Sequence, residues 1–395
     1  MDPGWIVLFS FLAEDLKPGD PLLEASHFSD PLTGKKVIRL TSGRDFNHLP
    51  AYHNNTDFTS DSKALVFSSW PKDRSVSYLM KADLETGLLT VIAALPALQK
   101  KGRFNGNNMA LSQTGGWILA YTYAYVGAYQ IDSREERIFA WTNAGCTFGH
   151  PAGSLDGNTV FIARKEVLPS GSYRYTVLGI DLASLESREL FSEEHSHCNH
   201  IQPNPRNPDE LLITREEELT SVKIPVQKEF YLHPRMIVLN LKTQKIVEIA
   251  PVMPERKWIV HMVWNHLGDQ LYYELKDDRA QKHELGIASP LGLNLWQKTI
   301  PRAGMAVHVG AHPLTNWMVV EGGVFEGPRR FLFLKPDANG KNGEPILEDI
   351  ATHDSEVESN TQESHGHSRI SPAGKWMAYN VQKNARSDVF VVKLK

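Results

Sequence analysis

Five of the 16 histidines in this 395-residue sequence follow one rule of spacing. Each lies four residues before the first residue of a small polar turn that precedes an apolar strand. We call this set the in-phase histidines: His150, His200, His261, His308 and His367. Asn55 and Asn108 occupy the same position in two further copies of the pattern. Clustered imidazoles repel when protonated, so five in one register favour divalent-metal binding or proton transfer near neutral pH.

The last copy of the pattern adds two more side chains that can hold a metal ion. His365 lies two residues before His367, so on a strand both rings would point to the same face. Gln362 precedes them and can offer an amide oxygen. Imidazoles with one amide oxygen suit a divalent transition ion, whereas a calcium site would need several carboxylates.

The polar turns themselves indicate how these histidines are positioned. Seven copies of turn and strand recur roughly 40 to 60 residues apart, the length of one four-stranded propeller blade. The turns lie at residues 59–63, 112–115, 154–157, 204–207, 265–268, 312–315 and 371–374. A second hairpin pattern, such as YLMKADLETGLLTVI (78–92), follows the copies. The sequence therefore predicts an all-β, seven-bladed β-propeller, with the in-phase histidines on the innermost strands around one axis.

The two ends of the chain predict how the ring closes. The C-terminal segment DVFVVKLK supplies only half of a hairpin, and residues 34–43 near the N-terminus supply the missing strand. An N-terminal strand that joins the last blade would leave no exposed sheet edge. We therefore expect an N-terminal extension over residues 1–29 and a single catalytic propeller domain over residues 30–395.

Composition excludes several classes of function. The 42 basic and 46 acidic residues give a net charge of −4, so no basic surplus indicates a nucleic-acid partner. The apolar run at residues 5–13 is too short to cross a bilayer, so we expect no membrane partner. We expect a cytoplasmic protein, with a periplasmic or secreted one as the alternative. No glycine-rich phosphate loop and no Gly-x-Ser-x-Gly motif occurs in the sequence.

Three segments resemble the oligogalacturonate lyase family. Gln362-x-x-His365-x-His367 followed by SPAGKWMAYN resembles the C-terminal region of those enzymes. The opening segment DPLTGKKVIRLT (30–41) and AYHNN (51–55) are similar to their N-terminal region. The resemblance extends at low density over nearly the whole chain. It implies a seven-bladed propeller that cleaves short pectic oligomers by β-elimination, with manganese held by three histidines and a glutamine.

The resemblance also implies a role for individual residues. The metal ligands would be His308, Gln362, His365 and His367, the catalytic base His261, and the substrate-binding arginine Arg235. His200 and His150 share the predicted ring, so we expect either to bind sugar or to assist the leaving group. Two features depart from the family pattern: the turn after His308 lacks Asp-Gly, and a methionine follows His261.

Two other functions remain open at this point. A propeller lyase of this kind could act on another uronate, such as ulvan. A non-catalytic interaction platform, similar to the Tol-type propellers, is the alternative from a different class. Such a platform would not need histidines in register around its axis, so metal binding separates it from a lyase. The oligomeric state, the chain length of the substrate and the metal's identity are left open by the sequence.

Overall fold

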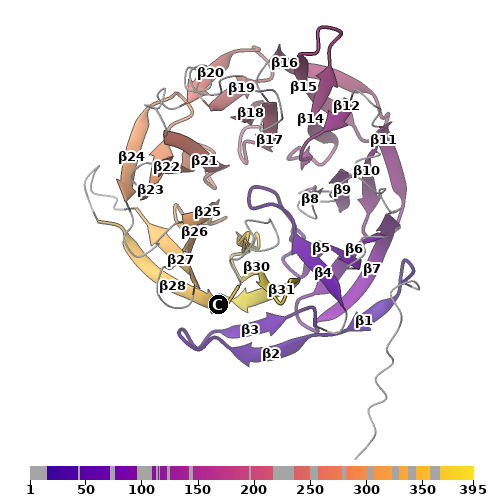
Figure 1. Cartoon of the computed structure of the whole chain (residues 1–395), viewed down its shortest axis with the longest axis vertical. Coiled ribbons are helices and arrows are strands. Elements are labelled where there is room, and N and C mark those ends of the chain that lie inside the picture. Colours follow the sequence, from indigo (N-terminus) through magenta and orange to yellow (C-terminus); the bar gives the residue numbers. More distant parts are fainter. Residues whose placement is uncertain are drawn as a thin grey trace, which may run out of the picture.

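The computed structural model forms a ring of seven small antiparallel sheets (Figure 1). It describes residues 16–42, 45–71, 76–95, 109–112, 114, 116–121, 125–141, 146–194, 197–216, 235–249, 257–277, 282–299, 306–322, 329–336, 344–355 and 365–395. Gln362 and Asn108 lie outside these ranges. Within them the chain forms no helix, and hence none that could cross a membrane. The predicted all-β, seven-bladed β-propeller is confirmed.

The first four blades follow one another along the chain. Blade 1 contains β4 (Phe46–Pro50), β5 (Ala64–Pro71), β6 (Ser77–Asp83) and β7 (Leu88–Leu95). Blade 2 contains β8 (Met109–Leu111), β9 (Trp117–Tyr121), β10 (Tyr125–Gln130) and β11 (Glu136–Trp141). Blade 3 contains β12 (Cys146–Phe148), β13 (Ala152–Gly153), β14 (Thr159–Val167), β15 (Tyr173–Asp181) and β16 (Ser187–Glu194). Blade 4 contains β17 (His197–Pro203), β18 (Glu210–Glu216), β19 (Met236–Asn240) and β20 (Ile246–Ile249).

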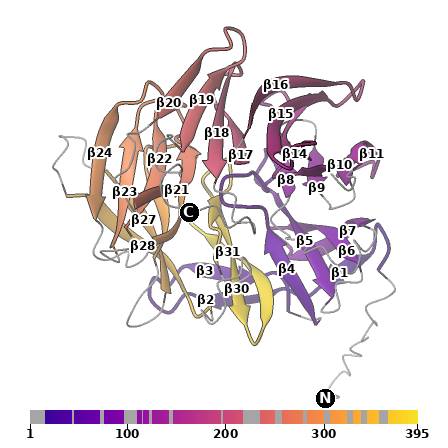
Figure 2. The same cartoon turned by 45° about the horizontal axis from the view of Figure 1, so that its top comes forward.

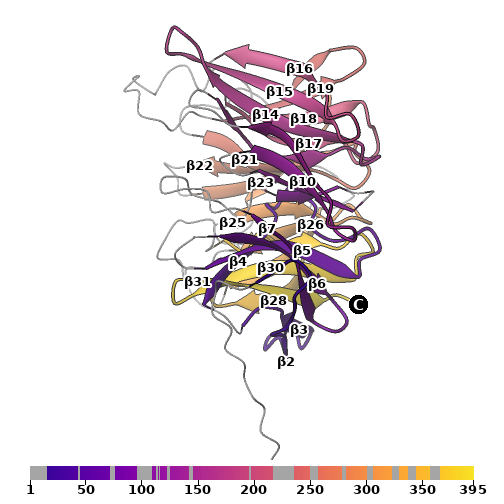
Figure 3. The same cartoon turned by 90° about the vertical axis from the view of Figure 1, so that its right-hand side faces the viewer.

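The last three blades complete the ring. Blade 5 contains β21 (Lys257–Trp264), β22 (Leu271–Asp277), β23 (Lys282–Ala288) and β24 (Asn294–Thr299). Blade 6 contains β25 (Ala306–Ala311), β26 (Met318–Gly322), β27 (Arg329–Lys335) and β28 (Ile346–His353). Blade 7 contains β29 (Arg369–Ile370), β30 (Trp376–Lys383) and β31 (Arg386–Lys393). In blades 5 and 6 the first strands, β21 and β25, lie nearest the axis (Figure 1), and Figure 3 shows the ring from its side.

An N-terminal strand closes the ring, as predicted. β3 (Lys36–Arg39) pairs with β31 of blade 7 and places the buried Ile38 opposite Val391. β2 (Ser26–Ser29) pairs with the outer side of β3, and β1 (Pro21–Leu23) pairs with β7 of blade 1. The segment before β3 thus joins the outer edges of the first and last blades (Figures 1 and 2). The boundary that we expected at residue 30 falls between β2 and β3.

The apolar core lies between neighbouring blades. Strands such as β5 are buried along their whole length because each sheet packs against a sheet on both faces. One cluster joins Tyr272 and Leu285 of blade 5 to Val309 and Val320 of blade 6. The blades therefore stabilise one another, and the ring holds its innermost strands at fixed positions around the axis.

The repeated polar turns fix the register of these innermost strands. In six blades the amide of the first turn residue donates to the carbonyl five residues further on, as Asn265 does to Gln270 and Ser371 to Trp376. Each bond closes the hairpin between the first and second strands of its blade. A residue four positions before the turn therefore comes to an equivalent place in each blade.

Candidate metal centre and active site

The in-phase histidines of blades 4 and 5 lie where the innermost strand is interrupted. The ladder shifts register between Asn199 and Gln202 in β17 and between Val260 and Val263 in β21. His200 and His261 at these bulges have left-handed backbone φ angles of 44° and 53°. A bulge bends its strand and redirects one side chain. The bulges explain how both rings leave the plane of the sheet and reach the axis.

The expected strand conformation of His365 and His367 is wrong. β29 begins only at Arg369, and His367 has a φ of 45°. The Gly366 amide donates to the Glu321 carboxylate of blade 6, at 2.7 Å, while the Gly366 carbonyl still accepts from the Asn380 amide of β30. The two rings nevertheless lie near one another, with centroids 5.8 Å apart.

The structure brings together three of the four predicted metal ligands. One ring nitrogen each of His308, His365 and His367 lies within 4.8 Å of the others. The His308 ring centroid is 4.5 Å from that of His367 and 5.2 Å from that of His365. His308 and His367 are buried. We call these three residues the histidine triad; the fourth predicted ligand, Gln362, lies outside the described residues.

The triad has the electronic state that a metal ligand needs. Burial lowers the pKa of His308 and of His367 well below the usual range, and it also lowers the pKa of His365. The neutral rings keep a lone pair for a cation. Nε2 of His308 and Nδ1 of His365 have no hydrogen-bond partner among the described residues. Buried polar atoms normally find a partner, so this donor set fits a divalent transition ion.

His261 lies beside the triad without belonging to it. Its ring centroid is 4.2 Å from that of His308, and its Nδ1 is 2.6 Å from Oε2 of Glu274. A carboxylate accepts, so Nδ1 of His261 carries the hydrogen and Nε2 carries the lone pair. Burial lowers the pKa of His261 well below the usual range. The predicted base is therefore a neutral imidazole oriented by a carboxylate.

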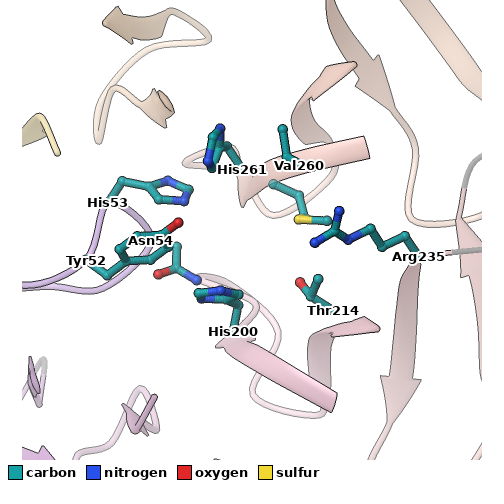
Figure 4. Close-up of a pocket in the computed structure, with 9 residues that line it drawn as sticks. Tyr52, His53, Asn54, His200, Thr214, Arg235, Val260 and His261 are labelled. Carbon is teal, nitrogen blue, oxygen red and sulfur yellow. The ribbon is translucent and has the colours of Figure 1, made fainter. Parts of the chain in front are cut away.

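The predicted arginine shares a cavity with this base. Tyr52, His53, Asn54, His200, Thr214, Arg235, Val260, His261 and Met262 line it. Figure 4 shows the Arg235 guanidinium on one side of the cavity, with His261 and His53 on the other. The cavity of about 60 Å³ holds several waters or one small charged group. A planar guanidinium in this position suits a carboxylate, which it can bind through two parallel hydrogen bonds.

Tyr52 lies in the middle of the group of histidines around the axis. It belongs to the segment between β4 and β5, which reaches the axis (Figure 1). Its ring stacks on His200 at 4.8 Å and lies 5.3 Å from His150 and 5.2 Å from His367. His150 and His200 stack on each other at 4.7 Å. His200 lines the cavity, whereas His150 contacts the site through Tyr52 and His200.

Sequence reasoning missed four residues of this site. His53 lies 4.9 Å from His308 and 5.2 Å from His261, between ring centroids, and its Nδ1 donates to the Val309 carbonyl. The segment AYHNN was part of the resemblance, but neither Tyr52 nor His53 is in phase with the repeat. Glu274 and Glu321 were missed as partners of His261 and His308. The equal spacing of the two His–Glu pairs, 13 residues in each, is a sequence signal that could have found them.

Fold and site together define a seven-bladed propeller whose axis carries a histidine cluster able to hold a divalent cation. Two solved structures of oligogalacturonate lyases share this fold with a TM-score of 0.74. The one from Vibrio parahaemolyticus is 15% identical, and one in complex with manganese is 17% identical. Each match covers 96% of this chain and 99% of the other.

Further comparisons give a weaker structural match and no match in sequence. A prolyl endopeptidase structure has a TM-score of 0.54 and is 11% identical, and the match covers 91% of this chain but only 50% of that one. No protein-family model and no curated protein sequence matches the chain. At these identities the structural likeness shows a common fold.

Proposed function

We propose that this protein is a metal-dependent polysaccharide lyase that cleaves short oligogalacturonides by β-elimination. One observation carries the proposal: three convergent neutral imidazoles, His308, His365 and His367, lie directly beside a fourth, His261, that is not part of their group. β-Elimination of a uronate needs both a cation for the carboxylate and a separate base. The similar oligogalacturonate lyase folds support the same class of reaction.

The triad would hold the cation, with Gln362 as the fourth ligand. A manganese or similar divalent ion in this place supplies a Lewis acid for the charge that develops on the substrate carboxylate. The protein's own contribution is to keep the three rings neutral by burial and to hold them close together. Glu321 is fully buried, and its Oε2 lies 3.2 Å from Nδ1 of His308.

His261 would remove the proton from carbon 5 of the sugar. Its Nε2 takes the proton, and the electron pair of that C–H bond forms the double bond between carbons 4 and 5. The bond from carbon 4 to the leaving oxygen breaks, and that oxygen keeps the electrons of the bond and takes a proton from water. Glu274 accepts from Nδ1 throughout, which fixes the ring and stabilises the imidazolium that forms. A neutral starting state is required for this step, and burial of His261 provides it.

Arg235 and the remaining axial histidines would bind the substrate. Arg235 faces the cavity across from His261, so its guanidinium can hold a second carboxylate of a uronic-acid chain. His200 lines the same cavity and can bind a sugar hydroxyl. His150 stacks on His200 and would act through it.

An activity screen tests this proposal. The purified protein, stripped of metal, is incubated with oligogalacturonides and with other uronates, including ulvan fragments, with and without manganese. We expect an ultraviolet-absorbing unsaturated product from oligogalacturonides only when manganese is present. Product from ulvan fragments but not from oligogalacturonides would show that the substrate is another uronate. Absence of product from every uronate, with manganese bound, would overturn it and favour a non-catalytic platform.

A further inference from the structure

Two neighbouring blades carry the same histidine–glutamate pair. His308 in β25 faces Glu321 in β26, and Glu274 in β22 faces the bulge of β21 that carries His261. The two residues of each pair are 13 positions apart. Both carboxylates are fully buried. The same histidine–glutamate pair therefore occurs in two neighbouring blades. The ring centroids of the two histidines, His261 and His308, lie 4.2 Å apart.

The second oxygen of each carboxylate distinguishes the two pairs. Oε1 of Glu274 accepts a hydrogen bond from His283 of its own blade. Oε1 of Glu321 instead accepts from the Gly366 amide, at 2.7 Å, in the neighbouring blade. Gly366 lies between His365 and His367. A single carboxylate thus contacts one triad histidine directly and the backbone that carries the other two.

The Gly366 segment is held closely enough that only glycine fits. A Cβ atom at position 366 would lie 2.5 Å from Cζ of Phe331 and 3.2 Å from Cδ of Glu321. The Gly366 carbonyl accepts from the Asn380 amide of β30, at 2.9 Å. The peptide between the two histidines is therefore fixed on one side by blade 7 and on the other by Glu321 of blade 6.

The Glu321 carboxylate also determines which nitrogen of His308 can bind a cation. A carboxylate only accepts, so Nδ1 of His308, 3.2 Å from Oε2, carries the hydrogen. Nε2 then keeps its lone pair, and this is the nitrogen that lacks a hydrogen-bond partner among the described residues. A carboxylate behind a metal-binding histidine fixes both its tautomer and its orientation.

We propose that Glu321 is a positioning residue that assembles the histidine triad from blades 6 and 7. Glu274, its counterpart in blade 5, orients His261 and also accepts from His283 of its own blade. The assignment of Glu321 rests on the proposed function only for the identity of the cation. The tautomer and the Gly366 hydrogen bond are properties of the metal-free chain.

The first test needs no metal. Histidine-selective ¹⁵N labelling of the metal-free wild-type protein, assigned with a His308→Gln variant, reports the His308 tautomer. We expect hydrogen on Nδ1 in the wild type. In Glu321→Gln the new side-chain amide donates toward Nδ1, so we expect hydrogen on Nε2. A wild-type His308 with hydrogen on Nε2 overturns the proposal, even if the variant does not fold.

The second test measures manganese affinity by titration calorimetry. We expect Glu321→Gln to lose about 10- to 100-fold in affinity, which is typical for loss of a carboxylate behind a metal ligand. Glu274→Gln is the matched control, because it removes the same group one blade away, and we expect it to retain manganese affinity. Equal affinities of wild type and Glu321→Gln would overturn the proposal. A wild type that binds no manganese would contradict the proposed function, while the tautomer would still decide the role of Glu321.

Discussion

At the scale of single residues, histidines that lie side by side differ in their proposed roles because their contacts differ. His308 converges with His365 and His367, whereas His261 lies beside them and faces the cavity that Arg235 lines. Burial keeps His261 and His308 neutral, and a carboxylate orients each of them. We assign His308 as a ligand because its ring converges with two other imidazoles, and His261 as the base because its ring is not part of that group.

This division of roles predicts that two substitutions both lower activity but differ in their effect on metal binding. His367→Ala removes one nitrogen of the triad, so we expect manganese binding and lyase activity to be lost together. His261→Ala leaves the triad complete, so we expect manganese to remain bound while kcat falls about 10²- to 10⁴-fold, the usual contribution of a positioned base. Metal content by mass spectrometry and initial rates check both expectations. Loss of metal from the His261→Ala variant would contradict the role assigned to His261.

At the scale of elements, the N-terminal strand β3 is required to complete the ring. Val37 is buried in a cluster with residues of blades 6 and 7, and Ile38 in a cluster with residues of blades 7 and 1. The Cα positions of β3 pair with those of β31. Without β3 the outer edge of β31 would expose unpaired backbone groups and apolar side chains. The site depends on this closure because His365 and His367 belong to the blade that β3 completes.

Closure can be tested with two substitutions on the same strand. Ile38 is 1% exposed, so Ile38→Ala is expected to lower the free energy of unfolding by about 2–5 kcal/mol. Lys36 is exposed on the same strand, and Lys36→Ala is expected to change it by less than about 0.5 kcal/mol. Urea unfolding followed by tryptophan fluorescence measures both. Equal stability of the two variants would show that β3 does not contribute to closing the ring.

The repeat made the fold and part of the site predictable from the sequence. A constant distance from each polar turn identified His261 and His308, because the turn hydrogen bonds fix the register of the innermost strands. Tyr52 and His53 have no place in this register, since they come from a segment between strands that reaches the axis. The bulges could not be predicted either, because the residue type histidine does not indicate the left-handed backbone conformation of His200 and His261.

At the scale of the whole molecule, the ring buries a set of histidines that are neutral in the folded state. Burial lowers the pKa of each of seven residues: His53, His261, His308, His312, His353, His365 and His367. The pKa values of His312 and His353 fall to about 4. The folded protein therefore excludes protons that the unfolded chain would bind, and this couples its stability to pH.

We expect the metal-free protein to lose stability as the pH falls. Above about pH 6.5 the histidines are neutral in both states, and below it only the unfolded chain takes up protons. Asp57, whose pKa burial raises to about 6, acts in the opposite direction as the pH falls toward that value, but it is one carboxyl against seven histidines. Urea unfolding from about pH 8 to about pH 6 therefore reports mainly on the histidines. A free energy of unfolding that stays constant or rises over this range would contradict the expectation.

The central claim is that imidazoles from two blades bind one cation beside a fourth imidazole that stays free. Anomalous diffraction at the manganese absorption edge, from crystals of the full chain soaked in manganese, tests it most directly. We predict one strong peak at the axis, within bonding distance of His308 Nε2 and of one nitrogen each of His365 and His367, with His261 not coordinated. A peak elsewhere, no peak at the axis, or an ion coordinated by His261 would contradict the account.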